Sequence, residues 1–168
     1  METVTLYTRQ NDKTLAQLER DGRIVNQRLY VRLHFGDCAD LFLESYEWFA
    51  QEAAKRVPRP DDGRLPIWCS ISRENCLKAI EGTVVYVLEV PKDQVIYFDE
   101  AKWDHVLNRI YIPESPEDAA AYKVHLKKLG VSDGFQFFQG RYAGMYPQEV
   151  ERIQESWKRV FTIDHWGI

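Results

Sequence analysis

The chain has 168 residues, a formal net charge of −4 and 13% aromatic residues. This length suits one domain that buries its core without metals or disulfides, and a composition of 45% hydrophobic and 29% charged residues excludes a disordered chain. The acidic balance argues against a general nucleic-acid binder, because such proteins gain affinity when Lys and Arg displace counterions from phosphates.

The first part of the chain predicts a strand, a short helix and a second strand. Residues 4–8 form an apolar run, and Asn11 and Asp12 are good N-caps for a helix that Gly22 ends. From Ile24 to Phe35, apolar and polar residues alternate with the period of a half-buried strand. The alternating residues are Leu29, Val31 and Leu33 on one face and Tyr30, Arg32 and His34 on the other.

A long helix and a surface loop follow. Asp37 or Asp40 is expected to cap a helix that runs to about Arg56, with apolar residues near helical spacing. Residues 57–63 combine Pro, Gly and charge, which indicates a loop. The basic residues around this loop could contact a phosphate or be solvated. They are Arg56, Arg59 and Arg64.

The middle of the chain predicts three strands and a brief helix. Residues 66–71 suggest a short buried strand, and Ser72 or Asn75 is expected to start a helix that Gly82 ends. Residues 83–90 have the highest strand propensity in the chain, being rich in Val, Tyr and Leu. A turn at residues 91–94 would join them to a strand at 95–98, as an antiparallel hairpin.

The last part predicts three helices separated by short strands. Asp99 is a good N-cap, Ser115 and Pro116 begin a helix that stops at Gly130, and a final helix runs from Pro147 through Trp157. Short strands are expected at residues 135–138 and 160–163. Helices inserted between strands and a hairpin predict the α+β class. We therefore expect a single domain, residues 1–168, with a central, mostly antiparallel sheet and flanking helices.

The spacing of the cysteines and the length of the apolar runs predict the cellular compartment of the protein. The three cysteines, Cys38, Cys69 and Cys76, lack the spacing of a disulfide framework and are expected to be reduced thiols. We expect no signal peptide, since a strand rather than a basic and apolar leader follows Met1. No apolar run approaches the ~18 residues of a membrane span. The expected location is cytoplasmic.

Several segments together resemble an uncharacterised family of bacterial and phage proteins. The similarity lies in Leu6–Gln10, Ser45–Phe49 and Pro66–Trp68, and continues through Phe98–Trp103 and Val106–Asn108. These segments span most of the chain. The family is classed as a domain of unknown function, so this resemblance implies membership but no activity.

A second resemblance is to the ADP-ribosyltransferases. One branch of that fold carries Arg on its first strand, an aromatic-x-Ser-x-Ser segment on the second and Glu-x-Glu late in the chain. Arg9, Trp68–Ser72 and Glu149–Glu151 stand here in that order. The resemblance implies NAD as cofactor and Glu149 and Glu151 as catalytic candidates. In the transferases the glutamate lies on a strand, whereas here Pro147 predicts a helix start, where acidic residues are also favoured by the helix dipole.

Arg9 is the candidate for holding a pyrophosphate or carboxylate, through the paired donors of its guanidinium group. A surface salt bridge at the strand end is the alternative. Because neighbouring side chains on a strand alternate, Thr8 and Gln10 should lie on the face opposite Arg9. These three side chains are therefore not expected to line one pocket.

Ser70 and Ser72 share a strand face and could bind the nicotinamide ribose, although Ser72 is also a plausible cap of the next helix. Gln136, on an expected late strand, could take the glutamate's place, in a protein that binds nucleotide without transfer chemistry. Cys69 is interpreted as a structural thiol, since no base can be placed beside it. No His, Cys or Asp cluster has metal-ligand spacing.

The leading hypothesis is an NAD- or nucleotide-binding protein similar to ADP-ribosyltransferases, acting on a nucleotide or protein substrate. The alternative is a non-enzymatic protein-interaction module of phage or bacterial defence origin, for which the aromatic content suits an interface. A third hypothesis is a hydrolase that uses Asp99 and His105, although Asp99 is also expected to cap its helix.

Overall fold

A computed structural model describes residues 1–63 and 65–164 of the chain. Arg64, one of the basic residues expected around the loop, lies outside the described residues, as does His165. The chain is an α+β protein whose sheet is antiparallel. Its residues gather into two compact units, Met1–Ile96 and Tyr97–Ile168, which are described in turn.

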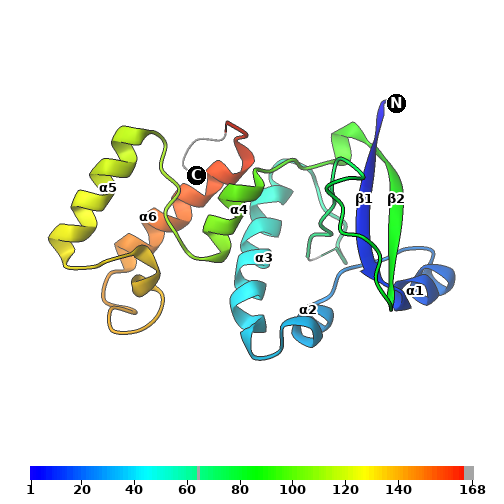
Figure 1. Cartoon of the computed structure of the whole chain (residues 1–168), viewed down its shortest axis with the longest axis horizontal. Helices are drawn as coiled ribbons and strands as arrows, with labels where there is room; N and C mark the ends of the chain where they lie inside the picture. The colour runs from blue at the N-terminus through cyan, green and yellow to red at the C-terminus, as the bar shows by residue number, and fades with distance from the viewer. Residues whose placement is uncertain (64, 165–168) are drawn as a thin grey trace. The chain divides into compact units, whose positions relative to one another are not determined.

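The first unit is built on two long strands. β1 (Thr3–Asn11) and β2 (Thr83–Pro91) pair antiparallel along their whole lengths and lie side by side in Figure 1. The strands expected at 4–8 and 83–90 are confirmed. The hairpin between 83–90 and 95–98 is wrong. After the 3-10 turn η2 (Lys92–Gln94) the chain runs on without a strand, because β1, and not the following segment, takes up the hydrogen bonds of β2.

Two helices of this unit follow their local signals differently. α1 (Lys13–Asp21) begins after Asp12 and ends at Gly22, whose φ of 69° is favourable for glycine, and this confirms the expected helix. The strand expected between Ile24 and Phe35 is wrong, since its second half is α2 (Arg28–Phe35). Val31 is buried, while Leu29 and Leu33 are exposed, so the alternating apolar residues do not share one buried face.

The longest helix carries the core of the first unit. α3 (Ala39–Ala54) confirms the expected helix, but its N-cap is Cys38, after the 3-10 turn η1 (Gly36–Cys38), and neither Asp37 nor Asp40 caps it. A single apolar cluster joins α2, α3 and the segment beyond the loop at 57–63. Its members are Val31, Leu43 and Leu65, with Phe35, Phe42 and Tyr46 packed against them.

The segment between the loop and β2 has little regular structure. The strand expected at 66–71 is reduced to one bridge, in which Ser70 pairs with Tyr7 of β1. The helix expected between Ser72 and Gly82 is wrong, because residues 71–82 form turns and irregular backbone. Local side-chain bonds offer the backbone an alternative to helix here, such as the bond that the Asn75 N–H donates to Ser72 Oγ at 3.3 Å.

The second unit is helical. α4 (Glu100–Leu107), α5 (Pro116–Leu129) and α6 (Pro147–Trp157) confirm the expected helices. The strands expected at 135–138 and 160–163 are wrong, and 3-10 turns η3 (Gly134–Phe137) and η4 (Lys158–Phe161) occupy these segments. Phe137 and Val160 are almost fully buried, so the turns each insert one apolar side chain into the core instead of forming a sheet edge.

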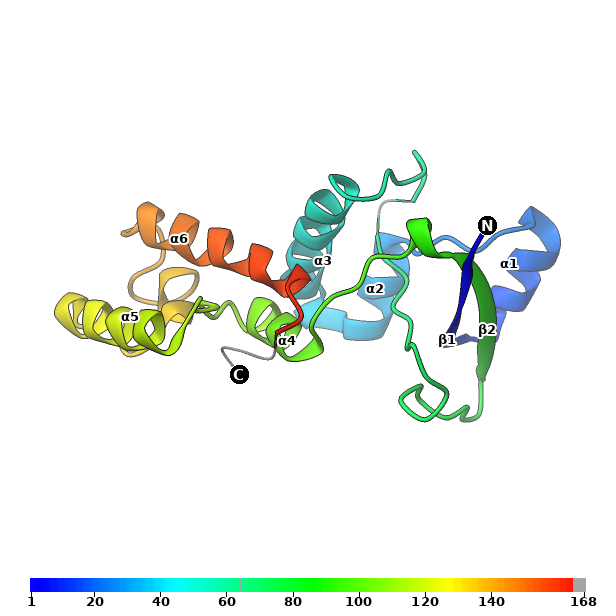
Figure 2. The ribbon, with the colours of Figure 1, turned by 90° about the horizontal axis from the view of Figure 1, so that it is seen from above.

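The core of the second unit lies around α6. Ile153 and Trp157 are buried on one face of this helix, and the indole N–H of Trp157 donates a 2.9 Å hydrogen bond to the Ile110 carbonyl. Figure 2 shows α5 and α6 side by side, which brings their facing side chains together. In the part of the chain that the structure describes, every helix is too short or too polar to cross a lipid bilayer.

Replacing Ser115 by alanine should lower the free energy of unfolding by about 1 kcal/mol, because the Ser115 Oγ accepts a 3.1 Å hydrogen bond from the Asp118 N–H at the start of α5. Urea denaturation followed by circular dichroism measures the change. Ser115→Asp should retain most of the stability, since aspartate is an equally good cap. Equal losses for both variants would show that the cap contributes nothing.

Candidate functional site

Arg9 and Ser70 lie on one face of the first unit. In an antiparallel pair, opposite residues project to the same side, so the bridge between Ser70 and Tyr7 places Ser70 on the side of Tyr7 and Arg9. The backbone hydrogen bonds of this bridge are 2.7 and 2.9 Å long. Arg9 is partly exposed, and its Nη1 donates a 3.1 Å hydrogen bond to the Lys78 carbonyl. Two of the residues expected to bind NAD therefore lie on the same face of this unit.

The opposite face of β1 is closed by its own hydrogen bonds. Thr8 is buried, and its hydroxyl donates to the Trp68 carbonyl at 2.7 Å. The side-chain amide of Gln10 donates in turn to Thr8 Oγ1 at 2.9 Å. The expected alternation is confirmed, because Thr8 and Gln10 contact each other while Arg9 points to the other face.

Ser72 and Cys69 have structural surroundings. The Ser72 hydroxyl accepts the bond from the Asn75 N–H described above, the capping type of contact that was the alternative to ribose binding. Burial raises the pKa of the Cys69 thiol, which lowers its reactivity as a nucleophile. Among the described residues, no group of three or more His, Cys, Asp or Glu side chains is arranged to hold a metal ion.

Gln136 and Glu151 lie in the second unit. Gln136 belongs to η3 and not to a strand, and its amide donates a 2.7 Å hydrogen bond to the Ser132 hydroxyl. Glu151 is exposed on α6. The late-strand position expected for Gln136 is wrong, because the aromatic residues around it pack as a 3-10 turn.

Glu149 differs from Glu151 in being buried, with 3% of its surface exposed. It stands in the first turn of α6, and its Oε1 lies 2.9 Å from Nε2 of His125 on α5. The imidazole of His125 is not aligned for a hydrogen bond to Glu149, so the two side chains are close enough for an ion pair but do not form a hydrogen bond. Arg152 Nε lies 3.7 Å from Oε2. A buried carboxylate is thus held between two partly exposed basic side chains.

Tyr122 stands beside this carboxylate. Its ring stacks on Tyr111 with centroids 4.1 Å apart, and its hydroxyl is buried and has no hydrogen-bond partner among the described residues. Burial, and then the charge of Glu149, raise the pKa of Tyr122, so the hydroxyl keeps its proton. Sequence reasoning missed Tyr122 and His125. Their i, i+3 spacing places both on one face of α5, which was the available signal.

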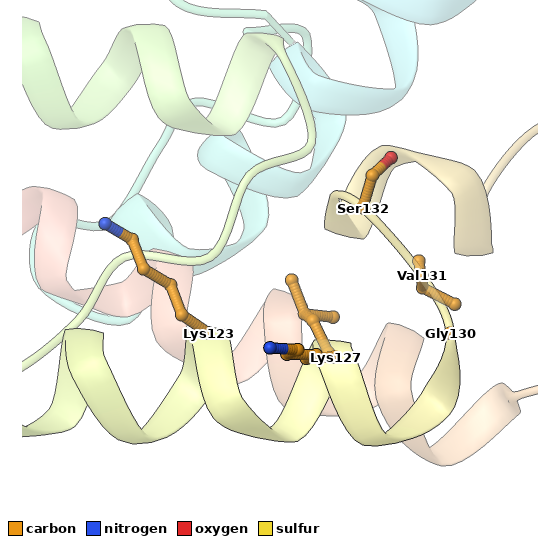
Figure 3. Close-up of a pocket in the computed structure, with 6 residues that line it drawn as sticks. Lys123, Lys127, Gly130, Val131 and Ser132 are labelled. Carbon is orange, nitrogen blue, oxygen red and sulfur yellow. The ribbon is translucent and has the colours of Figure 1, made fainter.

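An open depression lies along the last turns of α5 (Figure 3). Lys123 and Lys127 stand on one side of it, and Ser132 on the other. Lysines in the last turn of a helix are favoured by its dipole, which accounts for Lys127 and Lys128 without a ligand. The depression is therefore not the candidate site.

Asp99 and His105, the residues of the hydrolase hypothesis, are engaged in α4. The Asp99 carboxylate accepts hydrogen bonds from the N–H groups of Ala101 and Lys102 at 3.0 and 3.2 Å, which confirms it as the N-cap. His105 Nδ1 lies 2.9 Å from the Ala101 carbonyl oxygen. Both side chains therefore contribute to the helix itself.

Comparison with known proteins gives the family of the chain. A search of curated proteins returned no match. A search of solved structures likewise returned none. A family model, described as a domain of unknown function (DUF3841), matches residues 5–168. The match covers nearly the whole chain and confirms the resemblance seen in its segments from Leu6 to Asn108, so the chain belongs to the DUF3841 family.

Proposed function

We propose that the chain binds NAD or a related nucleotide and acts as an ADP-ribosyltransferase-like enzyme. The observation that carries the proposal is the carboxylate of Glu149, which is buried and lies beside His125 and Arg152. A carboxylate in such surroundings can orient a ribose hydroxyl and stabilise the positive charge that develops when the bond to nicotinamide breaks. Glu149 takes this role, because Glu151 is exposed and Gln136 has no charge.

Arg9 and Ser70, which the resemblance implies as nucleotide contacts, belong to the first unit, and their roles are proposed from that unit alone. Arg9 offers guanidinium donors of the kind that hold phosphates, and Ser70 lies on the same face. Ser72 is a weaker candidate, since its hydroxyl already accepts a backbone bond. The cytoplasm is the proposed compartment, because the three cysteines have free thiols, which suits a reducing environment.

Arg9→Ala is expected to weaken NAD binding about 10- to 100-fold, the loss of one or two charge-assisted hydrogen bonds. Isothermal titration of the purified chain with NAD measures this, with nicotinamide release assayed in parallel. Arg20→Ala is the matched control. Arg20 is an exposed arginine of the same unit that pairs with its neighbour Asp21 at 2.7 Å, and its removal should leave binding unchanged.

The proposal fails if the wild-type chain neither binds NAD nor releases nicotinamide. It also fails in its assignment of Arg9 if Arg9→Ala and Arg20→Ala bind NAD equally well. Melting temperatures of both variants, measured without ligand, separate a loss of binding from a loss of folding.

The rival proposal is a non-enzymatic protein-interaction module. One observation favours it: α2 exposes Leu29 and Leu33, which are 58% and 75% exposed and four residues apart on one helix face. A chain that binds no NAD, yet forms a complex of fixed stoichiometry that Leu29→Ser abolishes and Glu149→Gln leaves intact, would favour the module over the enzyme.

A further inference from the structure

Three buried polar atoms near α5 and α6 have unused hydrogen-bonding capacity, namely the Tyr122 hydroxyl, Glu149 Oε2 and His125 Nε2. His125 Nε2 faces Glu149 Oε1 at 2.9 Å, so among the described residues the other two are the atoms without a neighbouring polar group at hydrogen-bond length. The Tyr122 hydroxyl donates to no acceptor, and Glu149 Oε2 accepts from no donor, within the ranges 1–63 and 65–164. The nearest charge to Oε2 that the ion pairs give is Arg152 Nε, at 3.7 Å, beyond hydrogen-bond length. Buried polar groups are nearly always satisfied, so these two atoms, whose residues are close enough for the Glu149 charge to act on Tyr122, require an explanation.

The two atoms have complementary roles. The Tyr122 hydroxyl is a donor, because its raised pKa keeps it protonated, and the Glu149 carboxylate oxygen is an acceptor. A hydroxyl group both donates and accepts one hydrogen bond, so a single hydroxyl placed between the two would satisfy both. A phosphate would not, because its oxygens would face the carboxylate.

The charged side chains near Glu149 indicate which second group the ligand carries besides its hydroxyl. Arg152, whose side chain is 50% exposed, lies beside Glu149, whereas the Nε2 of His125 is buried and faces the carboxylate. The guanidinium group of Arg152 carries N–H donors that suit an anion outside the buried pair. A small ligand with a hydroxyl at one end and a phosphate at the other matches this order of groups.

We infer that Tyr122 and Glu149 bind one hydroxyl of a phosphorylated sugar, with Arg152 at its phosphate. The inference deepens the proposed function and rests on it in one respect, namely that the sugar is the ribose of a nucleotide. It adds Tyr122 as a residue that contacts the ligand. Gly134 lies against the same hydroxyl, since a Cβ at this position would come within 3.0 Å of it and 2.8 Å of an Ile153 methyl group.

The test compares two stacked tyrosines. Tyr122→Phe removes an unpaired hydroxyl, whereas Tyr111→Phe removes one that donates to Asp118 Oδ2 at 2.9 Å. Without ligand, Tyr122→Phe should leave Tm unchanged within about 1 °C or raise it, and Tyr111→Phe should lower Tm by about 2–4 °C. Tyr122→Phe should weaken the binding of ADP-ribose about 3- to 10-fold, and Tyr111→Phe should not.

Ribose 5-phosphate, titrated into the full chain, separates this inference from the proposed function. If NAD and ADP-ribose do not bind, but ribose 5-phosphate raises the Tm of the wild type and not of Tyr122→Phe, the hydroxyl site stands without the transferase. If NAD is turned over and Tyr122→Phe binds ADP-ribose as the wild type does, the inference is overturned and the transferase stands. Two further results overturn the inference: a Tm loss in Tyr122→Phe equal to that of Tyr111→Phe, which indicates a tightly held structural water, and no binding of any sugar phosphate.

Discussion

Nicotinamide release from NAD is expected to fall about 100- to 1,000-fold when Glu149 is replaced by glutamine, the range typical of removing one electrostatic contact to the transition state. The substitution keeps the shape of the side chain and its place between His125 and Arg152, but removes the negative charge. Stabilisation of positive charge in the transition state requires that charge, whereas binding of the ground state does not. The rate should therefore fall much further than the affinity for NAD.

Glu151→Gln is the matched control for this experiment. Glu151 lies on the same helix, carries the same charge and is exposed. The Glu151→Gln variant should therefore release nicotinamide at a rate within twofold of the wild type, as expected of a surface change. Circular dichroism and Tm confirm that Glu149→Gln is folded. Equal rates for the two variants, with NAD turned over by both, would remove Glu149 from the catalytic role and leave the enzyme without its carboxylate.

The elements that the sequence predicts correctly are those with strong local signals. α5 has Ser115 at its N-cap, Pro116 in its first turn and Gly130 after its end, and each of these acts within a few residues. The same holds for Asp99 before α4 and for the β-branched run of β2. Here local chemistry and the final structure agree, and tertiary context is not needed.

The errors arise where a short apolar segment gives no local reason to choose between helix, strand and turn. The alternation of apolar and polar residues from Leu29 to Leu33 fits a strand, yet the segment forms α2. As a helix it packs Val31 and, in part, Phe35 against α3, and this packing stabilises the helix more than the alternation favours a strand. Residues 135–138 are aromatic enough for a strand, but the strands in the described part of the chain, β1 and β2, pair with each other and not with this segment. Pairing is long-range information. For the same reason the local pattern predicts the wrong partner for β2, which pairs with β1 and not with residues 95–98.

The candidate site was predicted in part for the same reason. The motif predicts Glu149 as a candidate, but the surroundings that bury it include His125 of α5, which lies 24 residues earlier in the chain. His125 gave no signal by itself, because a lone histidine on a helix has no preferred role. The packing of α5 on α6 brings His125 next to Glu149, and no local sequence pattern predicts that packing.

Lys102→Ala should lower the free energy of unfolding by about 2–4 kcal/mol, the largest effect on stability that the ion pairs suggest. Only 2% of the Lys102 side chain is exposed, and its ammonium group bonds to the Thr162 carbonyl at 2.7 Å and to the Asp164 carboxylate. Truncation leaves a cavity where the four-carbon stem lay, and a carbonyl without its donor. Asp164 is 50% exposed and can be hydrated, so the loss stays below that of a fully buried pair.

Lys102→Met separates the two contributions to this loss. Methionine refills most of the cavity but makes no hydrogen bond, so the packing contribution should return and about 1–2 kcal/mol should remain lost. Lys158→Ala is the control, because Lys158 pairs with Glu155 at 2.8 Å on the surface of the same unit and should cost less than about 0.5 kcal/mol. Urea unfolding followed by tryptophan fluorescence measures all three. Equal urea midpoints for Lys102→Ala and Lys158→Ala would show that the buried ammonium group of Lys102 does not hold the segment after η4 to α4. They would also show that the packed stem of Lys102 does not stabilise the fold.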